Sequence, residues 1–194
     1  MQLKNTFLIL FVLFTLSGCA QHKKVTKKKQ PKKTAKVDTK KPTNIHDSDS
    51  AKNDTLSAIA KDKADSIVAY AEKYLGVRYR YGGMDPKGFD CAGFVCFVFN
   101  HQGIKLPRTA DAQALLGVEV SRKNARPGDL VYFKGRDVHN KAIGHVGIVI
   151  ENNNGQIKFI SATVSAGIHI DDIDGTYWKE RYVFTKRILT QKKK

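Results

Sequence analysis

Five short runs in the second half of the chain are rich in β-branched and aromatic residues, and turn residues separate them. The runs are Asp129–Phe133, His145–Ile150, Gln156–Ile160, Ile168–Ile170 and Tyr182–Ile188. The helical patterns all come before them. Helices followed by strands that meander through turns are typical of α+β proteins. The sequence therefore predicts an α+β fold with N-terminal helices packed on an antiparallel sheet of about five to six strands.

Three segments before these runs have helical character. Apolar residues recur at helical spacing over Leu56–Tyr74, and Gly76 supplies a stop signal. The strongly apolar segment Cys91–Gln102 predicts a buried helix that Gly103 closes. A short helix is expected at Ala110–Leu116. Between the second and third strand-like runs, an Asn-Asn-Asn-Gly sequence predicts a tight hairpin turn.

The N-terminus has the pattern of a bacterial signal peptide. Lys4 precedes the apolar run Phe7–Leu16, which is too short to span a bilayer. The Leu-Ser-Gly-Cys sequence that follows resembles a lipobox and ends at Cys19. We expect residues 1–18 to be a signal peptide with lipobox, and Cys19 to carry acyl chains such as palmitate. An Ala after the cysteine resembles the signal for the Gram-negative outer membrane, which implies an anchored protein that faces the periplasm.

Residues 19–55 are rich in Lys, Thr, Ser and Asp and hold few large apolar side chains. Such a segment cannot bury enough surface to offset its ordering entropy, so we expect a disordered Lys-rich tether. Much of the net charge of +16 lies in this tether, where no aromatic residue is interleaved for base stacking. Nucleic-acid binding is therefore not expected. We expect residues 56–194 to form the single catalytic domain and to be monomeric.

A cysteine at the start of a predicted helix is the best candidate for chemistry. Of the three cysteines, Cys91 follows a Gly-rich stretch and begins the apolar helix, where unpaired amides and the helix dipole stabilise a thiolate. The neighbouring Ala92 and Gly93 suggest room for a substrate backbone to approach closely. Cys96 lies within the same helix and is expected to be a core residue. No set of residues has zinc-ligand spacing, so no metal or cofactor is expected.

Five sequence segments, of which the first two form one block with the predicted nucleophile, resemble four blocks of the NlpC-like cell-wall endopeptidases. They are Tyr-Arg-Tyr-Gly-Gly at 79–83, Gly-Phe-Asp-Cys-Ala-Gly-Phe-Val at 88–95, Leu-Pro-Arg-Thr-Ala at 106–110, Arg-Pro-Gly-Asp-Leu-Val-Tyr-Phe at 126–133 and His-Val-Gly-Ile-Val at 145–149. The blocks occur in the family's order and span essentially the whole predicted domain. The resemblance implies a papain-like fold and hydrolysis of peptidoglycan stem peptides, at the bond between D-γ-glutamate and a diamino acid.

The same resemblance assigns roles to single residues. Cys91 matches the nucleophile, His145 matches the general base, and Tyr79 matches a tyrosine beside the nucleophile. The residues expected to bind substrate are Asp90, Arg108 and Thr109. The resemblance gives Asp90 a part in holding a substrate amine. A carboxylate beside the thiol would otherwise raise its pKa, so we expect the substrate to bring a cation there.

The residue that orients the histidine is less well defined. The family places His, Asn or Gln at a position that is Ser161 here, and serine is short and neutral. Ser161 could orient His145, His169 could replace it, or the Cys–His pair could act as a dyad. The substitution also leaves open a second function, a catalytically impaired lipoprotein that binds the cell wall.

Overall fold

The computed structural model describes residues 48–189, which lie within one compact unit, Asn44–Lys194. The predicted signal peptide, the lipidation residue Cys19 and most of the predicted tether lie outside the described residues. Within the described part of the chain, no helix combines the length and apolarity needed to cross a membrane.

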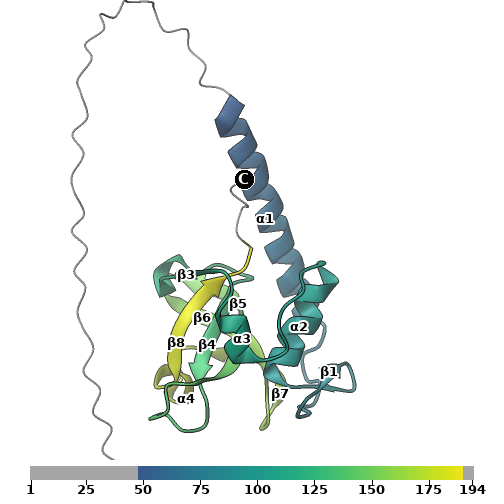
Figure 1. Cartoon of the computed structure of the whole chain (residues 1–194), viewed down its shortest axis with the longest axis vertical. Coiled ribbons are helices and arrows are strands. Elements are labelled where there is room, and N and C mark those ends of the chain that lie inside the picture. Colours follow the sequence, from purple (N-terminus) through teal and green to yellow (C-terminus); the bar gives the residue numbers. More distant parts are fainter. Residues whose placement is uncertain (1–47, 190–194) are drawn as a thin grey trace, which may run out of the picture. The chain divides into compact units, whose positions relative to one another are not determined.

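The first helix, α1, spans Ser48–Glu72 (Figure 1) and begins eight residues earlier than we predicted. The segment Ser48–Thr55 was assigned to the disordered tether, and that boundary is wrong. The segment contains neither glycine nor proline. Extending an existing helix adds one hydrogen bond for each residue that is fixed, so a polar segment can continue a helix whose C-terminal half is packed. Ile67 and Ala71 provide that packing, because both are fully buried.

Two further helices and a small ribbon surround the predicted nucleophile. Helix α2 spans Cys91–His101 and α3 spans Ala110–Ala114, close to the predicted ranges. The strands β1 (Met84–Asp85) and β2 (Gly88–Phe89) form a two-stranded antiparallel ribbon immediately before α2. Sequence periodicity did not predict this ribbon, because two-residue strands carry no periodicity.

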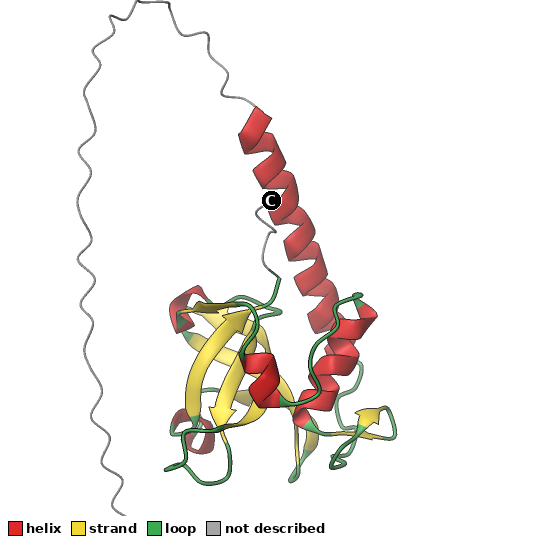
Figure 2. Ribbon diagram, viewed as in Figure 1, coloured by secondary structure: helices red, strands yellow, loops and turns green. Residues whose placement is uncertain are grey.

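The central sheet has six antiparallel strands in the order β3-β8-β4-β5-β6-β7 (Figure 2). Its strands are β3 (Val118–Val120), β4 (Leu130–Lys134), β5 (Ile143–Asn153), β6 (Gln156–Thr163), β7 (Gly167–Asp172) and β8 (Tyr182–Arg187). The predicted α+β class and strand number are confirmed. The β5–β6 hairpin turns at Asn154 and Gly155, which both have positive φ, as the Asn-Gly pair predicted.

Each face of the sheet packs a separate core. On one face, Val146, Ile148 and Ile160 pack in a cluster with the buried residues of α2. On the other face, Phe133 and Phe159 pack against Trp178 of the short helix α4 (Thr176–Lys179). Successive residues of a strand face opposite sides, so Val146 faces α2 while its neighbour on β5 faces the second core. This alternation places the side chain of His145 next to Trp178.

Candidate active site

Cys91 is the first residue of α2, and its thiol lies against β5. The backbone amides of Val146, Ala92 and Cys91 itself act on the sulfur as hydrogen-bond donors and favour a thiolate. Burial is the largest effect and raises the pKa of the thiol, and the charge of Asp90 raises it further. Since Val146 directly follows His145, the fold brings the predicted nucleophile to the strand that carries the predicted base.

His145 lies on β5 with its Nε2 atom 3.1 Å from the hydroxyl oxygen of Ser161 on β6. Ser161 is fully buried. Burial, with a smaller effect of His169, lowers the pKa of His145 to about 3. Imidazole is therefore neutral at physiological pH, as a general base must be. The thiol of Cys91, whose pKa is raised, and the imidazole of His145 are thus both favoured in their neutral forms.

Trp178 covers the imidazole and was not identified from the sequence. Its ring lies 4.8 Å from that of His145, and Phe133 approaches the same imidazole at 5.9 Å. These rings explain the burial that keeps His145 neutral. The signal that could have found Trp178 is its status as the only tryptophan in the chain, set among polar residues just before the last strand.

His169 lies on β7 directly opposite Ser161 in the strand register. Its Nδ1 atom is 3.1 Å from the carbonyl oxygen of Gly167, and its Nε2 atom is 2.7 Å from a carboxylate oxygen of Asp171. Of the two residues considered as orienters, Ser161 is the one in hydrogen-bond contact with His145. The catalytic role of Ser161 stays a prediction.

Asp90 caps α2 and is held by four hydrogen bonds. Its carboxylate accepts from the backbone amides of Gly93 at 2.7 Å and Gly82 at 3.0 Å. Arg108 donates to both carboxylate oxygens, at 3.0 Å to Oδ1 and through a second, shorter contact to Oδ2. Arg108 thus already supplies a cation to this carboxylate, so the chain does not depend on substrate to pair its charge. Substrate binding by Asp90 and Arg108 remains a prediction.

Tyr79 and Thr109 lie on either side of this cap in the sequence. Tyr79 forms an isolated bridge with Phe89, two residues before Cys91. Burial raises the pKa of Tyr79, and the negative charges of Cys91 and Asp90 add to the effect. The role of Tyr79 beside the nucleophile stays a prediction. Thr109 is exposed at the start of α3, and its hydroxyl bonds to Asp111, whose pKa it lowers.

The space beside Gly93 is filled by the protein itself. A Cβ at Gly93 would lie only 2.0 Å from the carbonyl oxygen of Gly83. The expectation that Gly93 leaves room for a substrate backbone is therefore wrong. Its missing side chain allows the Gly-rich loop to pack against the first turn of α2. That packing holds the loop amide of Gly82 against Asp90.

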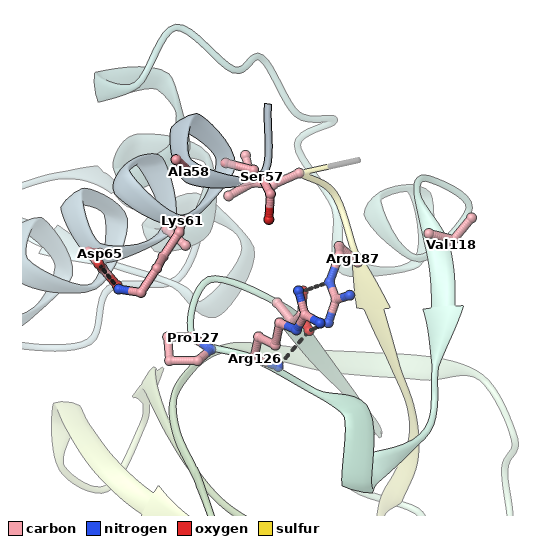
Figure 3. Close-up of a pocket in the computed structure, with 12 residues that line it drawn as sticks. Ser57, Ala58, Lys61, Asp65, Val118, Arg126, Pro127 and Arg187 are labelled. Carbon is pink, nitrogen blue, oxygen red and sulfur yellow. Dashed lines mark hydrogen bonds and ion pairs between the residues drawn. The ribbon is translucent and has the colours of Figure 1, made fainter. Parts of the chain in front are cut away.

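A cavity of about 870 Å³ lies elsewhere, between α1 and the ends of β4 and β8 (Figure 3). None of the predicted site residues lines it. Its walls include Ala58, Lys61, Asp65, Val118, Arg126 and Arg187. Two basic residues of the wall form ion pairs: Lys61 of α1 pairs with Asp65, and Arg187 of β8 pairs with Asp129. Among residues described by the structure, no group of three or more His, Cys, Asp or Glu could hold a metal ion.

The chain is similar in sequence to proteins named as peptide-bond hydrolases. The chain is 43% identical over 123 residues to the murein DD-endopeptidase MepS/murein LD-carboxypeptidase of Escherichia coli K12, covering 63% of this chain and 61% of that protein. It is 40% identical over 134 residues to the gamma-DL-glutamyl hydrolase of Bacillus subtilis 168, covering 66% and 31%. The chain thus spans about three fifths of the first relative and one third of the second.

Solved structures agree with the fold. The crystal structure of an NlpC/P60 family protein from Bacillus cereus superposes with a TM-score of 0.60 and 26% sequence identity, covering 66% of this chain and 40% of that one. The model of the NlpC/P60 family matches residues 76–187, more than half of the 194 residues. The matched range contains α2, the central sheet and every predicted site residue except Cys19. The chain belongs to the NlpC/P60 family.

Proposed function

We propose that this protein is a cell-wall cysteine peptidase that hydrolyses the stem peptides of peptidoglycan. One observation carries the proposal: the thiol of Cys91 lies at the start of α2 against β5, where His145 is neutral and hydrogen-bonded to Ser161. A thiol, a base and amide donors at a helix start are the components of amide hydrolysis by cysteine. The family and the names of both relatives support peptide bonds as the target.

In the acylation step, His145 removes the proton from the thiol of Cys91. The thiolate attacks the carbonyl carbon of the scissile amide, and the amides at the start of α2 are placed to meet the developing oxyanion. The imidazolium then gives its proton to the leaving amine as the C–N bond breaks. A thioester between Cys91 and the acyl half of the substrate remains.

In the deacylation step, neutral His145 takes a proton from water, whose oxygen attacks the thioester. The C–S bond breaks, the carboxylic acid leaves and the thiolate is reprotonated from the imidazolium. Burial disfavours both the thiolate of Cys91 and the imidazolium of His145. The ion pair of the two therefore forms only where neighbouring groups stabilise its charges. The hydrogen bond from Nε2 to Ser161 keeps the imidazole oriented throughout, with Nδ1 free to exchange the proton.

The first bond to test is the one between D-γ-glutamate and the diamino acid, which the gamma-DL-glutamyl name of the Bacillus relative supports. The name of the Escherichia relative supports a D,D bond instead. Incubating the full chain with an uncrosslinked stem tripeptide and with a D,D-crosslinked dimer separates the two by product mass. Cleavage of the tripeptide after glutamate supports the first bond, and cleavage only of the crosslink supports the second. Failure on both would contradict the proposal.

We further propose that the mature protein begins at Cys19 and is anchored by lipid, including palmitate, to the outer membrane. The apolar run, the lipobox pattern and the Lys-rich spacer support this location. A tether of this composition would extend the catalytic domain away from the bilayer toward the wall. Metabolic labelling with palmitate tests it: wild type should be labelled, and Cys19→Ala should not. An unlabelled wild type would contradict lipid anchoring.

A further inference from the structure

The N-cap of α2 contains an electrostatic conflict. Asp90 is needed as a cap, because its carboxylate accepts the amide of Gly93 at 2.7 Å and fixes the first turn. The same negative charge lies one residue from Cys91 and opposes ionisation of the thiol. An unpaired carboxylate here would stabilise the helix and weaken the nucleophile.

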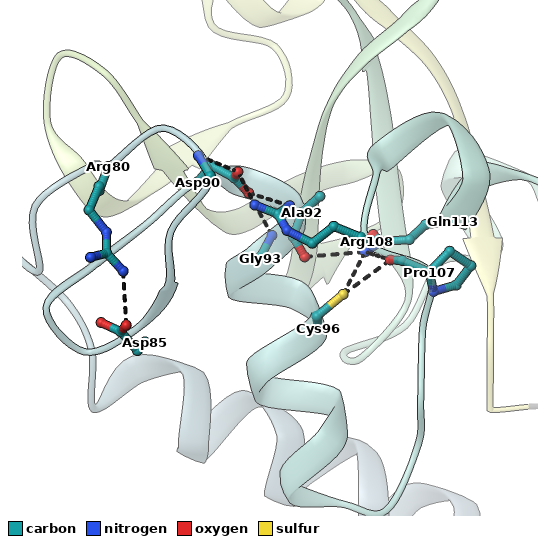
Figure 4. A network of polar contacts seen from close by, with 10 residues as sticks. Arg80, Asp85, Asp90, Ala92, Gly93, Cys96, Pro107, Arg108 and Gln113 are labelled. Atoms are coloured by element: carbon teal, nitrogen blue, oxygen red, sulfur yellow. Dashed lines mark hydrogen bonds and ion pairs between the residues drawn. The ribbon is translucent and has the colours of Figure 1, made fainter.

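Arg108 resolves the conflict from the segment that connects α2 to α3 (Figure 4). Its guanidinium donates to both oxygens of the Asp90 carboxylate, in the bidentate geometry that only arginine provides. The side chain of Asp90 is only 12% exposed, so solvent screens the pair less than a surface ion pair. The hydrogen bonds to Asp90 are the main cause that raises the pKa of Arg108, and the negative charges of Asp90, Cys96 and Cys91 add smaller effects.

The fold fixes the backbone of this segment on α2. The buried side chain of Gln113 donates to the carbonyl oxygens of Pro107 at 2.8 Å and Ala92 at 3.2 Å. The thiol of Cys96 donates to the same Pro107 carbonyl at 3.1 Å. Two groups, the Gln113 amide and the Cys96 thiol, thus hold the residue that immediately precedes Arg108, and Figure 4 shows Arg108 reaching from this point to the cap. Much of its orientation is set before any substrate binds.

We propose that Arg108 is a positioning residue whose guanidinium neutralises the Asp90 carboxylate, so that the cap is kept and the thiolate of Cys91 can form. This role rests on the proposed function and differs from the substrate contact that the sequence predicts for Arg108. Two other titratable groups on neighbouring elements are Tyr79, which interacts with the charge of Cys91, and His145, which precedes the Val146 amide that bonds to the thiol. Neither residue contributes a permanent positive charge, since Tyr79 is a phenol and burial keeps His145 neutral.

The test measures the thiol without substrate. The rate of Cys91 alkylation by iodoacetamide is followed against pH by mass spectrometry of the Cys91 peptide in the full chain, with Cys91→Ala as the blank. Arg108→Gln should raise the apparent pKa of the thiol by about one unit and slow alkylation at pH 7 about tenfold. Arg108→Lys should recover part of the rate. Arg80→Gln, which removes an arginine paired at 2.9 Å with Asp85, is the matched control and should alkylate like wild type.

The double variant Asp90→Asn with Arg108→Gln decides the mechanism. Asparagine caps helices as well as aspartate, so the helix start is kept while no unpaired charge remains. Its alkylation rate should return to within about twofold of wild type. Arg108→Gln with a wild-type pH profile, or a double variant as slow as the single one, would overturn the proposal. A wild type that alkylates as expected and cleaves no muropeptide would contradict the proposed function alone.

Discussion

The Nε2 atom of His145 lies 3.1 Å from the hydroxyl oxygen of Ser161, on the neighbouring strand of the sheet. With Nε2 engaged, Nδ1 is the ring atom that can accept a proton from the thiol. A serine hydroxyl fixes the ring but adds no negative charge, so it stabilises the imidazolium less than a carboxylate does. In this site, Ser161 contributes to the orientation of the imidazole, and Trp178 contributes to its burial by covering the ring.

Replacing Ser161 by alanine should lower kcat on muropeptides about three- to tenfold with little change in KM. This is the effect of one neutral hydrogen bond, worth about 0.5–1.5 kcal/mol. His169→Gln is the comparison, because His169 contacts Gly167 and Asp171 rather than the imidazole. It should change kcat less than twofold. A larger loss in His169→Gln than in Ser161→Ala would show that His169 orients the base.

The pH dependence of stability should report the buried His145. Its folded-state pKa of about 3 lies below the unfolded value of 6.5, so protons bind the unfolded chain more readily at acidic pH. The contribution of the neutral His145 to the free energy of unfolding is therefore present above pH 6.5 and is lost as the pH falls toward the folded-state pKa. Between pH 6.5 and 5, the free energy of unfolding should fall about 1–2 kcal/mol more for wild type than for His145→Gln. Denaturant titrations give both values, and parallel curves would rule out a depressed pKa.

A methyl group at Gly93 should disrupt the loop that packs on α2. The added Cβ would lie 2.0 Å from the carbonyl oxygen of Gly83, and neither backbone segment can move freely. Gly93→Ala should therefore destabilise the protein by about 1–3 kcal/mol and reduce activity. Gly135→Ala is the control, because its Cβ would meet only the Cα of Gly144 at 3.7 Å. Its stability should stay within about 0.5 kcal/mol of wild type; equal stability of the two variants would mean that the loop is not in close contact.

The sheet and the buried helix could be predicted because their apolar patterns are local. The predicted run His145–Ile150 lies within β5, and the predicted helix Cys91–Gln102 matches α2 to within one residue. The start of α1 was misplaced because a polar segment gives no apolar periodicity even where it is helical. Strand β3 was missed for a different reason: its Val-Glu-Val sequence is largely exposed and becomes a strand only through pairing with β8.

In the site, the residues with local signals could be predicted and their long-range partners could not. A cysteine at a helix start is visible in the sequence, and so is a histidine at the start of a strand. The pairing of Arg108 with Asp90 joins residues 18 positions apart. Trp178 reaches the imidazole from a four-residue helix. Both contacts depend on how the elements pack, which no sequence period encodes.

The most direct measurement follows muropeptide digestion by wild type and Cys91→Ala at matched stability. Both full-length proteins are incubated with purified muropeptides, products are identified by mass spectrometry, and thermal unfolding confirms that both are folded. Wild type should release cleaved stem peptides, and Cys91→Ala should release none above the uncatalysed background, because no other group in the site can form the thioester. Equal product from the two proteins, or no product from wild type, would contradict the assignment of Cys91 as the nucleophile of a peptidoglycan peptidase.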